Sequence, residues 1–167
     1  LHGAAAGAKS KPLLELSQAR YAIPVDFPKG FMPYRSTPSE GGKRASVNYV
    51  NAAALVAAKA GQALPDGSAI VGVTMVVKLD SDGKPLTGAD GYPVADKVLS
   101  YSTMASAPNW GDAIPDLLRN GNWTYALFTA VRQPREGVSY AECFACHKAR
   151  SATRYVFTLD QVKAVKY

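Results

Sequence analysis

The stretch Ala69-Ile70-Val71-Gly72-Val73-Thr74-Met75-Val76-Val77-Lys78-Leu79 says most about the fold of this chain. It is rich in Val, Ile and Thr, whose branched side chains suit the pleated backbone of a β-strand. Before it stands Leu64-Pro65-Asp66-Gly67, a turn sequence in which Pro presets φ and Gly accepts a positive φ. We therefore predict a strand from Ala69 to Leu79. Successive side chains of a strand point to opposite faces of the sheet. One face of this strand should therefore carry Gly72, Thr74 and Val76, and the other Val71, Val73 and Met75.

Further segments after this strand have secondary-structure preferences of their own. Three runs of aromatic and branched residues predict strands, at Lys97 to Met104, Trp123 to Val131, and Arg154 to Leu159. Between the first two, Trp110 to Leu118 predicts a short helix that stops near Asn120-Gly121. The sum is an α+β fold, mainly an antiparallel β-sheet with a few helices.

The first half of the chain combines a proline-rich segment with an alanine-rich one. Tyr21 to Pro38 contains four prolines and cannot form a helix interior, so we expect an extended segment that wraps the domain. Val47 to Ala60 is alanine-rich, follows Ser46 as a candidate N-cap and ends at Gly61, which predicts a helix. We expect residues 1–20 to be a poorly ordered N-terminal segment and residues 21–167 to form a single domain.

The composition limits the class of protein. The 167 residues suit one domain; 47% are hydrophobic and 19% are charged, as in globular proteins. No apolar run approaches the roughly 20 residues that span a bilayer, so we expect no membrane span. The net charge of +6 comes from scattered cations without a nucleic-acid motif. We therefore expect a solvated basic surface and no nucleic-acid partner.

Both cysteines of the chain stand in Cys143-Phe144-Ala145-Cys146-His147, close to the C-terminus. The pattern C-x-x-C-H is typical of covalent haem attachment. Two thiols three residues apart can each add to one vinyl group at the same porphyrin edge, and the adjacent imidazole can reach the iron. We predict one covalent haem c bound near the C-terminus, with Cys143, Cys146 and His147 binding the cofactor and His147 as the metal ligand.

Two other functions, a redox-active dithiol and a structural zinc site, use related cysteine motifs. A redox-active dithiol also uses C-x-x-C, but normally at the start of a helix after a strand in a thioredoxin-like unit, which is not evident here. A structural zinc needs four ligands, whereas the chain offers the three residues of the motif and the N-terminal His2. We therefore favour haem attachment, which makes residues 21–167 a single haem-binding cytochrome domain.

The position of the motif bears on the second face of the iron. Neither Met nor His follows His147, and the methionines Met32, Met75 and Met104 all lie upstream. Methionine is a common gap-filler in apolar interiors, so we expect each of these three to be a core or strand residue rather than an iron ligand. We expect the same of the aromatic residues Trp123, Tyr125 and Phe128, although they could also form a pocket wall. An iron without a sixth protein ligand suits the binding of a small molecule.

Several stretches in a fixed order suggest a family. Phe27-Pro28-Lys29-Gly30, Leu64-Pro65-Asp66-Gly67-Ser68, Asn120-Gly121-Asn122-Trp123, Cys143-Phe144-Ala145-Cys146-His147-Lys148 and Tyr155-Val156-Phe157-Thr158 resemble the family that contains cytochrome P-460 and cytochrome c′-beta, from about Phe27 to Leu159. The resemblance implies a mainly β fold, commonly a homodimer, in the bacterial periplasm. It also implies a five-coordinate haem with His147 as its proximal ligand.

The resemblance implies two types of activity, and this chain departs from one of them. Members of the first type oxidise hydroxylamine. They use a haem that is cross-linked to a strand lysine, and a distal glutamate that transfers protons. Members of the second type bind gases such as nitric oxide in an apolar pocket. Here Gly72 stands at the lysine position and Ser102 roughly at the glutamate position. Lys78, the nearest lysine on the strand, is six residues further on, about 20 Å along an extended chain.

These departures favour non-enzymatic ligand binding, although the sequence leaves open whether the protein is an enzyme. We expect a periplasmic mono-haem cytochrome whose five-coordinate haem binds a small diatomic or nitrogenous ligand such as nitric oxide. Two alternatives remain: an oxidoreductase that acts on hydroxylamine or a related nitrogen species, and an electron-transfer cytochrome with a periplasmic redox partner.

Overall fold

Five strands form one antiparallel sheet in the order β1-β2-β3-β4-β5 in the computed structural model, which describes residues 16–166. The strands are β1 (Phe31–Ser39), β2 (Arg44–Asn51), β3 (Ala69–Val77), β4 (Ala95–Ser106) and β5 (Trp123–Thr129). The helices are α2 (Ala52–Lys59), α3 (Ala141–Lys148) and α4 (Leu159–Lys163), with short 3-10 turns η1 (Glu40–Gly42) and η2 (Ser151–Thr153). The α+β class and its antiparallel sheet are confirmed.

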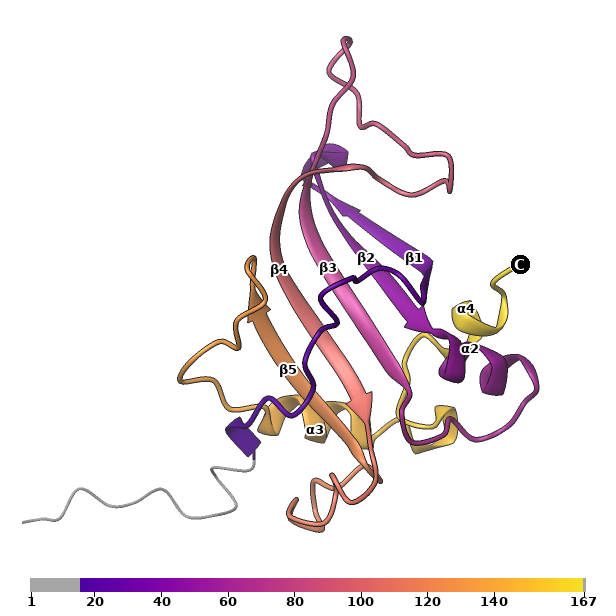
Figure 1. Cartoon of the computed structure of the whole chain (residues 1–167), viewed down its shortest axis with the longest axis vertical. Coiled ribbons are helices and arrows are strands. Elements are labelled where there is room, and N and C mark those ends of the chain that lie inside the picture. Colours follow the sequence, from indigo (N-terminus) through magenta and orange to yellow (C-terminus); the bar gives the residue numbers. More distant parts are fainter. Residues whose placement is uncertain (1–15, 167) are drawn as a thin grey trace, which may run out of the picture.

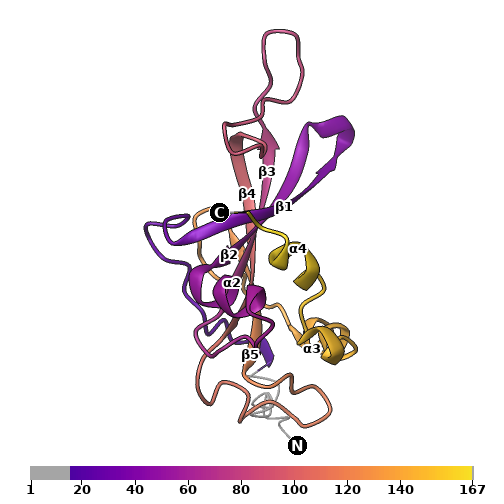
Figure 2. The same ribbon diagram turned by 90° about the vertical axis from the view of Figure 1, so that its right-hand side faces the viewer.

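The sheet lies between two different layers. In Figure 1 the chain that leads into β1 crosses in front of the strands, whereas α3 lies behind them. Figure 2 shows the sheet edge-on, with this leading segment on one side and α3 and α4 on the other. The long connection between β3 and β4 projects beyond the sheet at the top of both views.

The strand register determines which residues share a face of the sheet. Gly72 of β3 is opposite Asn48 of β2 and Ser102 of β4, so these three residues lie in one row. We call their side of the sheet the cavity face; it also carries Ile70, Met104, Tyr125 and Leu127. We call the other side the packed face; it carries Val47, Val71, Val73, Met75, Tyr101 and Phe128. The predicted alternation along β3 is thus confirmed.

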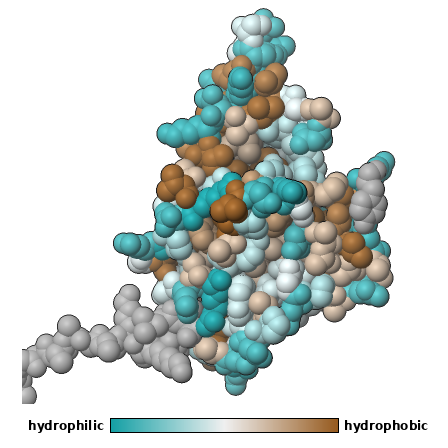
Figure 3. Space-filling model, viewed as in Figure 1, coloured by the Kyte–Doolittle hydropathy of each residue, from teal (hydrophilic) through white to brown (hydrophobic). Residues whose placement is uncertain are grey.

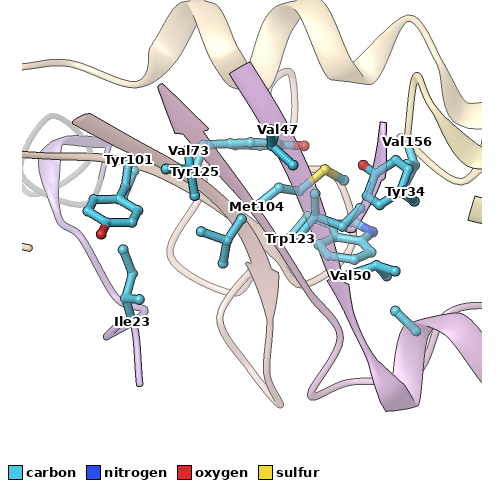
Figure 4. Close-up of a cluster of buried hydrophobic side chains, with 14 of the residues drawn as sticks. Ile23, Tyr34, Val47, Val50, Val73, Tyr101, Met104, Trp123, Tyr125 and Val156 are labelled. Atoms are coloured by element: carbon cyan, nitrogen blue, oxygen red, sulfur yellow. The ribbon is translucent and has the colours of Figure 1, made fainter. Parts of the chain in front are cut away.

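The packed face is covered by residues 16–27. Phe27 contacts the rings of Tyr49 and Tyr101 edge-on, with centroids 5.1 and 6.2 Å apart. The Arg132 guanidinium lies 5.6 Å from the Phe27 ring centroid and 5.4 Å from that of Tyr101, and it donates a hydrogen bond of 2.8 Å to the Pro24 carbonyl. Figure 4 shows Ile23 of the same segment beside Tyr101. Burial of apolar side chains and the contacts of the Arg132 guanidinium therefore hold residues 16–27 against the packed face.

The predicted helix from Val47 to Ala60 is wrong in its first half. Residues up to Asn51 belong to β2, because Val47 and its neighbours pair with β3 and bury their apolar side chains. The N-cap is Asn51 rather than Ser46: its side chain accepts hydrogen bonds from the backbone N–H groups of Ala54 and Ala69. The predicted stop at Gly61 is supported, since Gly61 has a φ of 68° directly after the helix.

The predicted helix from Trp110 to Leu118 does not form either. The Arg119 side chain donates hydrogen bonds of 2.8 Å to the carbonyls of Gly111 and Ile114, which a helix would use for its own backbone. Pro115 has no N–H to donate. The segment is instead a series of turns, such as the one closed by the Ile114 N–H and the Gly111 carbonyl.

The predicted strand from Arg154 to Leu159 is also wrong. Arg154 and Tyr155 both have left-handed backbone conformations, with φ of 56° and 65°, which a strand cannot contain. The segment is a turn that leads into α4 at Leu159. The branched and aromatic composition of these residues reflects burial, since Val156 and Leu159 are part of the hydrophobic core.

The proline-rich segment from Tyr21 to Pro38 is extended only in part. Its second half is β1, an edge strand in which Pro33 and Pro38 are tolerated because one side has no partner strand. Its first half turns back on itself between Pro24 and Gly30. Residues 1–15 of the predicted disordered segment lie outside the described residues, and Leu16 is buried in the core.

Within residues 16–166, no helix is long and apolar enough to cross a membrane. On the side of the molecule seen in Figure 3, hydrophobic side chains form small separate groups among hydrophilic ones. This distribution is consistent with the scattered charges in the sequence.

Candidate functional site

Helix α3 brings the three residues of the C-x-x-C-H motif to one cavity. Cys143, Cys146 and His147 are spaced i, i+3 and i+4, which places them on the same side of a helix. All three line a cavity of about 480 Å³ between α3 and the cavity face of the sheet. The volume lies within the range of small-molecule and cofactor sites.

Phe144 anchors the other side of α3. Its side chain is 2% exposed and meets the Tyr125 ring edge-on, with 4.9 Å between centroids. Its carbonyl accepts a hydrogen bond of 2.9 Å from the amide of Asn120, which is fully buried and also donates to the Tyr125 hydroxyl. The motif helix is therefore fixed to β5 by one of the two residues between its cysteines.

The other walls of the cavity come from the five strands and the segment before α4. Most of the lining surface is apolar, and the polar groups are few and uncharged on the strands. Residues from these walls are Tyr34, Asn48, Ile70, Gly72, Ser102, Met104, Tyr125, Leu127, Val156, Phe157 and Thr158. A half-open, mainly apolar cavity beside two thiols and an imidazole suits a large flat organic group.

The His147 ring is fixed from three directions. Its Nδ1 lies 2.6 Å from the Tyr155 carbonyl, which can only accept, so Nδ1 carries the proton and donates. The Tyr125 ring lies 4.6 Å away at a 31° tilt, and the Phe157 ring meets it edge-on at 4.9 Å. Nε2 is left as the nitrogen with a free lone pair, as a metal-binding imidazole requires.

Burial lowers the pKa of His147, and the hydrogen bond to Tyr155 opposes this in part. The lowered pKa favours the neutral imidazole, which is the form that binds a metal. For Cys143, burial raises the thiol pKa, whereas Cys146 is exposed.

A strained turn presents the carbonyl that holds His147. Arg154 and Tyr155 are consecutive non-glycine residues with positive φ, a conformation that costs about 1 to 3 kcal/mol for each residue. The turn is held by the Tyr155 N–H, which donates to the Arg150 carbonyl at 2.8 Å. The Arg154 guanidinium also donates to the Gly61 carbonyl at 2.7 Å. Without Gly or Asn at these positions, nothing in the sequence pointed to this turn.

A hydrogen bond closes the cavity at the edge of the sheet. The Tyr34 hydroxyl of β1 lies 2.8 Å from the Thr158 hydroxyl, and Tyr34 is 7% exposed. Val156, from the same segment as Thr158, lies next to Tyr34 in Figure 4. Sequence reasoning missed Tyr34 and Asn48, because their role depends on strand pairing over long sequence distances.

The alternatives for the cysteine motif gain no support from the described residues. The two thiols are free rather than joined in a disulfide. Within residues 16–166, no group of three or more His, Cys, Asp and Glu side chains is arranged to hold a metal ion. His2, considered as a fourth zinc ligand, lies outside these residues.

The structure brings together the two positions that depart from the hydroxylamine-oxidising type. Gly72 and Ser102 are directly opposite each other and both line the cavity. Lys78 lies at the exposed start of the β3–β4 connection and does not line the cavity.

The methionines and aromatic residues named above are core residues, as expected. Met75, Met104, Trp123, Tyr125 and Phe128 are buried in the hydrophobic core, and Met32 in β1 is partly buried against it. Met104 and Tyr125, which are opposite each other in β4 and β5, also line the cavity.

Comparison with known proteins identifies the family. The family model described as Cytochrome P460 matches residues 24–158, most of the chain. The chain belongs to the cytochrome P460 family. Among curated proteins, none matched. Family membership confirms the resemblance found in the sequence and indicates a haem-binding, iron-binding cytochrome of the c type.

The cavity of this cytochrome P460 family member fits a haem. Its donor set combines two thiols one helical turn apart with an imidazole whose Nδ1 is already occupied. Residues Cys143 and Cys146 would hold the porphyrin edge, and His147 would bind the iron. The apolar walls supplied by Ile70 and Met104 suit the faces of a porphyrin.

Proposed function

We propose that this protein carries one covalent haem c and binds a small ligand, such as nitric oxide, on the iron face opposite His147. Cys143 and Cys146 form the thioether bonds, and His147 is the single protein ligand of the iron. The observation that carries this proposal is the cavity, which joins the motif residues to an apolar space bounded by neutral strand residues.

The residues around the cavity support a five-coordinate iron. His147 is the one histidine within residues 16–166, so no second imidazole from this part of the chain can bind the opposite face. Met104 is the methionine that lines the cavity, but it lies opposite Tyr125, whose ring packs against His147. Met104 therefore lies next to the ring that packs against His147, and we expect it not to be an iron ligand.

When bound, the haem supplies an iron with an open position that coordinates a small molecule. The residues of the chain do the remaining work. Tyr155 keeps the proton on Nδ1 of His147, and the rings of Tyr125 and Phe157 hold the imidazole in one orientation. The hydrogen bond between Tyr34 and Thr158 limits access of water at the sheet edge.

The covalent bond is tested by mass spectrometry of protein matured with the c-type haem attachment machinery. We expect the denatured wild-type chain to keep the mass of one haem, and Cys143→Ser and Cys146→Ser to weaken or abolish stable attachment. A wild-type chain without added haem mass would contradict the proposal.

Coordination is tested by electron paramagnetic resonance of the ferric protein and by carbon monoxide binding to the ferrous protein. A five-coordinate haem should give a high-spin signal and should bind carbon monoxide without first losing a protein ligand. A purely low-spin signal at neutral pH would contradict it and favour the electron-transfer alternative.

Hydroxylamine oxidation is less well supported. Among residues 16–166, no lysine lines the cavity. The carboxylate that lines it in this part of the chain, on Glu142, lies exposed in the first turn of α3 rather than on the strands. Peptide mapping of the haem-bearing peptide is the direct test. A haem peptide joined to a second, lysine-containing peptide would revive the enzyme alternative.

We further propose, from the family resemblance, that the protein acts in the bacterial periplasm as a homodimer, where a redox partner can reach it. Cell fractionation and light scattering of the mature protein test the two points separately. Cytoplasmic holoprotein would contradict the first, and a monomer at micromolar concentration would contradict the second.

A further inference from the structure

The cavity face has a hollow at Gly72, between two polar side chains. A Cβ atom added at Gly72 would lie 2.6 Å from Oγ of Ser102 and 3.6 Å from Nδ2 of Asn48. Both polar atoms therefore converge on the space that a side chain at position 72 would fill. All three residues line the cavity that holds Cys143 and His147.

The two polar side chains have no protein partner. Within residues 16–166, neither Asn48 nor Ser102 makes a side-chain hydrogen bond. Ser46, on the same face of β2, differs: its hydroxyl lies 3.3 Å from that of Thr74, and it does not line the cavity. Ser102 is exposed and Asn48 is half-buried, so both donors are open to a ligand that enters the cavity.

The hollow lies beyond the residues that pack against His147. Tyr125 stands opposite Met104, and the next row across the same face consists of Asn48, Gly72, Ser102 and Leu127. Tyr125 contacts the imidazole, so the row of Met104 and Tyr125 is the one next to His147. The Gly72 row is one row further along the strands and lines the cavity away from this contact.

We propose that Asn48 and Ser102 donate hydrogen bonds to the outer atom of a small ligand bound to the iron, and that Gly72 leaves the space for it. This inference rests on the proposed function and names the residues that determine which ligands the haem site prefers. The ligand class is a small molecule whose outer atom carries partial negative charge when bound to ferrous iron. One donor is an amide and the other a hydroxyl, and both are neutral, so they stabilise a bound ligand without acting as a general base.

The test uses mature holoprotein in three forms: wild type, Asn48→Leu and Ser102→Ala, with carbon monoxide and nitric oxide as probes. A hydrogen bond to bound carbon monoxide lowers the C–O stretching frequency, so each variant should raise it in the infrared spectrum. Loss of a net hydrogen bond should also speed nitric oxide dissociation from ferrous iron by about twofold to tenfold for each residue. Ser46→Ala is the matched control and should change neither value.

The outcomes separate this inference from the proposed function. If carbon monoxide binds all forms with an unchanged stretching frequency, the inference is overturned while the open haem site stands. If no form binds carbon monoxide, the proposed function fails, and this inference fails with it. Ser102 is exposed, so Ser102→Ala should fold even if Asn48→Leu does not, and its spectrum alone can overturn the role of Ser102.

Discussion

The two faces of the sheet are built from alternate residues of the same strands, yet they are covered in different ways. On the packed face, Val73, Tyr101 and Phe128 are buried beneath Phe27 and its neighbours. On the cavity face, Gly72 and Ser102 leave a space of about 480 Å³ beneath α3. Filling by side chains stabilises the first face, whereas the second keeps room for a group that is not protein.

This difference leads to opposite expectations for substitutions. On the packed face, removal of side-chain volume should cost stability, because the surrounding residues cannot fully collapse into the gap. On the cavity face, substitutions in the Gly72 row should change ligand properties more than folding. Four variants test the comparison, in order of decreasing effect on the free energy of unfolding.

Phe128→Ala should have the largest effect. Phe128 is 2% exposed on the packed face, and loss of a buried aromatic ring typically costs about 3 to 5 kcal/mol. Urea denaturation followed by circular dichroism measures the change. Val25→Ala is the control: Val25 is 98% exposed, and its substitution should stay within about 0.5 kcal/mol. A Phe128→Ala protein of near wild-type stability would show that the packed face is not a continuous core.

Arg132→Met should come next, because it removes contacts that hold residues 16–27 against the packed face. It removes the hydrogen bond to the Pro24 carbonyl and the cation above the rings of Phe27 and Tyr101, while keeping much of the side-chain length. We expect a loss of about 2 kcal/mol and faster hydrogen exchange in residues 24–27. Arg135→Met is the control, since Arg135 is exposed. Unchanged exchange in residues 24–27 would mean that Arg132 does not hold the cover.

Tyr34→Phe should have a smaller effect on the other cover, the segment over the cavity face. It keeps the ring but removes the hydroxyl that bonds Thr158, at a cost of about 1 kcal/mol. In the holoprotein we expect carbon monoxide to enter faster, because the segment before α4 is less firmly tied to β1. Thr158→Val should reproduce this result, and additive effects in the double variant would show that the two residues do not act as a pair.

Gly72→Ala should change stability least, within about 0.5 kcal/mol. The backbone of Gly72 is ordinary strand, and the nearest obstacle is the rotatable hydroxyl of Ser102. The methyl group should nevertheless occupy the hollow and weaken nitric oxide binding to the ferrous protein by severalfold. Substitution on the packed face, with Val73→Ala, should show the reverse pattern: lower stability and unchanged ligand binding. Equal stability losses for both variants would remove the distinction between the two faces.

Prediction from the sequence worked best where the signal was local. The strands β3, β4 and β5 follow from runs of branched and aromatic residues, and the end of α2 follows from Gly61. The alternation along β3 also placed Gly72 and Val73 on opposite faces. The helix prediction failed for residues 47–51. The alanine-rich sequence that follows them favours a helix, but pairing with β3 stabilises a strand there more than local propensity stabilises a helix.

The sequence by itself determined the cytochrome P460 family resemblance and the spacing of Cys143, Cys146 and His147. Both depend on short stretches of consecutive residues, which can be identified without knowing how the chain folds. Only the tertiary structure decided what surrounds those residues. Asn48 and Ser102 line one cavity through strand pairing, and a left-handed turn places the Tyr155 carbonyl against His147. Tyr34 contacts Thr158, 124 positions away, at the edge of the same cavity. Such contacts depend on the free energy of packing the whole chain, which no single segment carries.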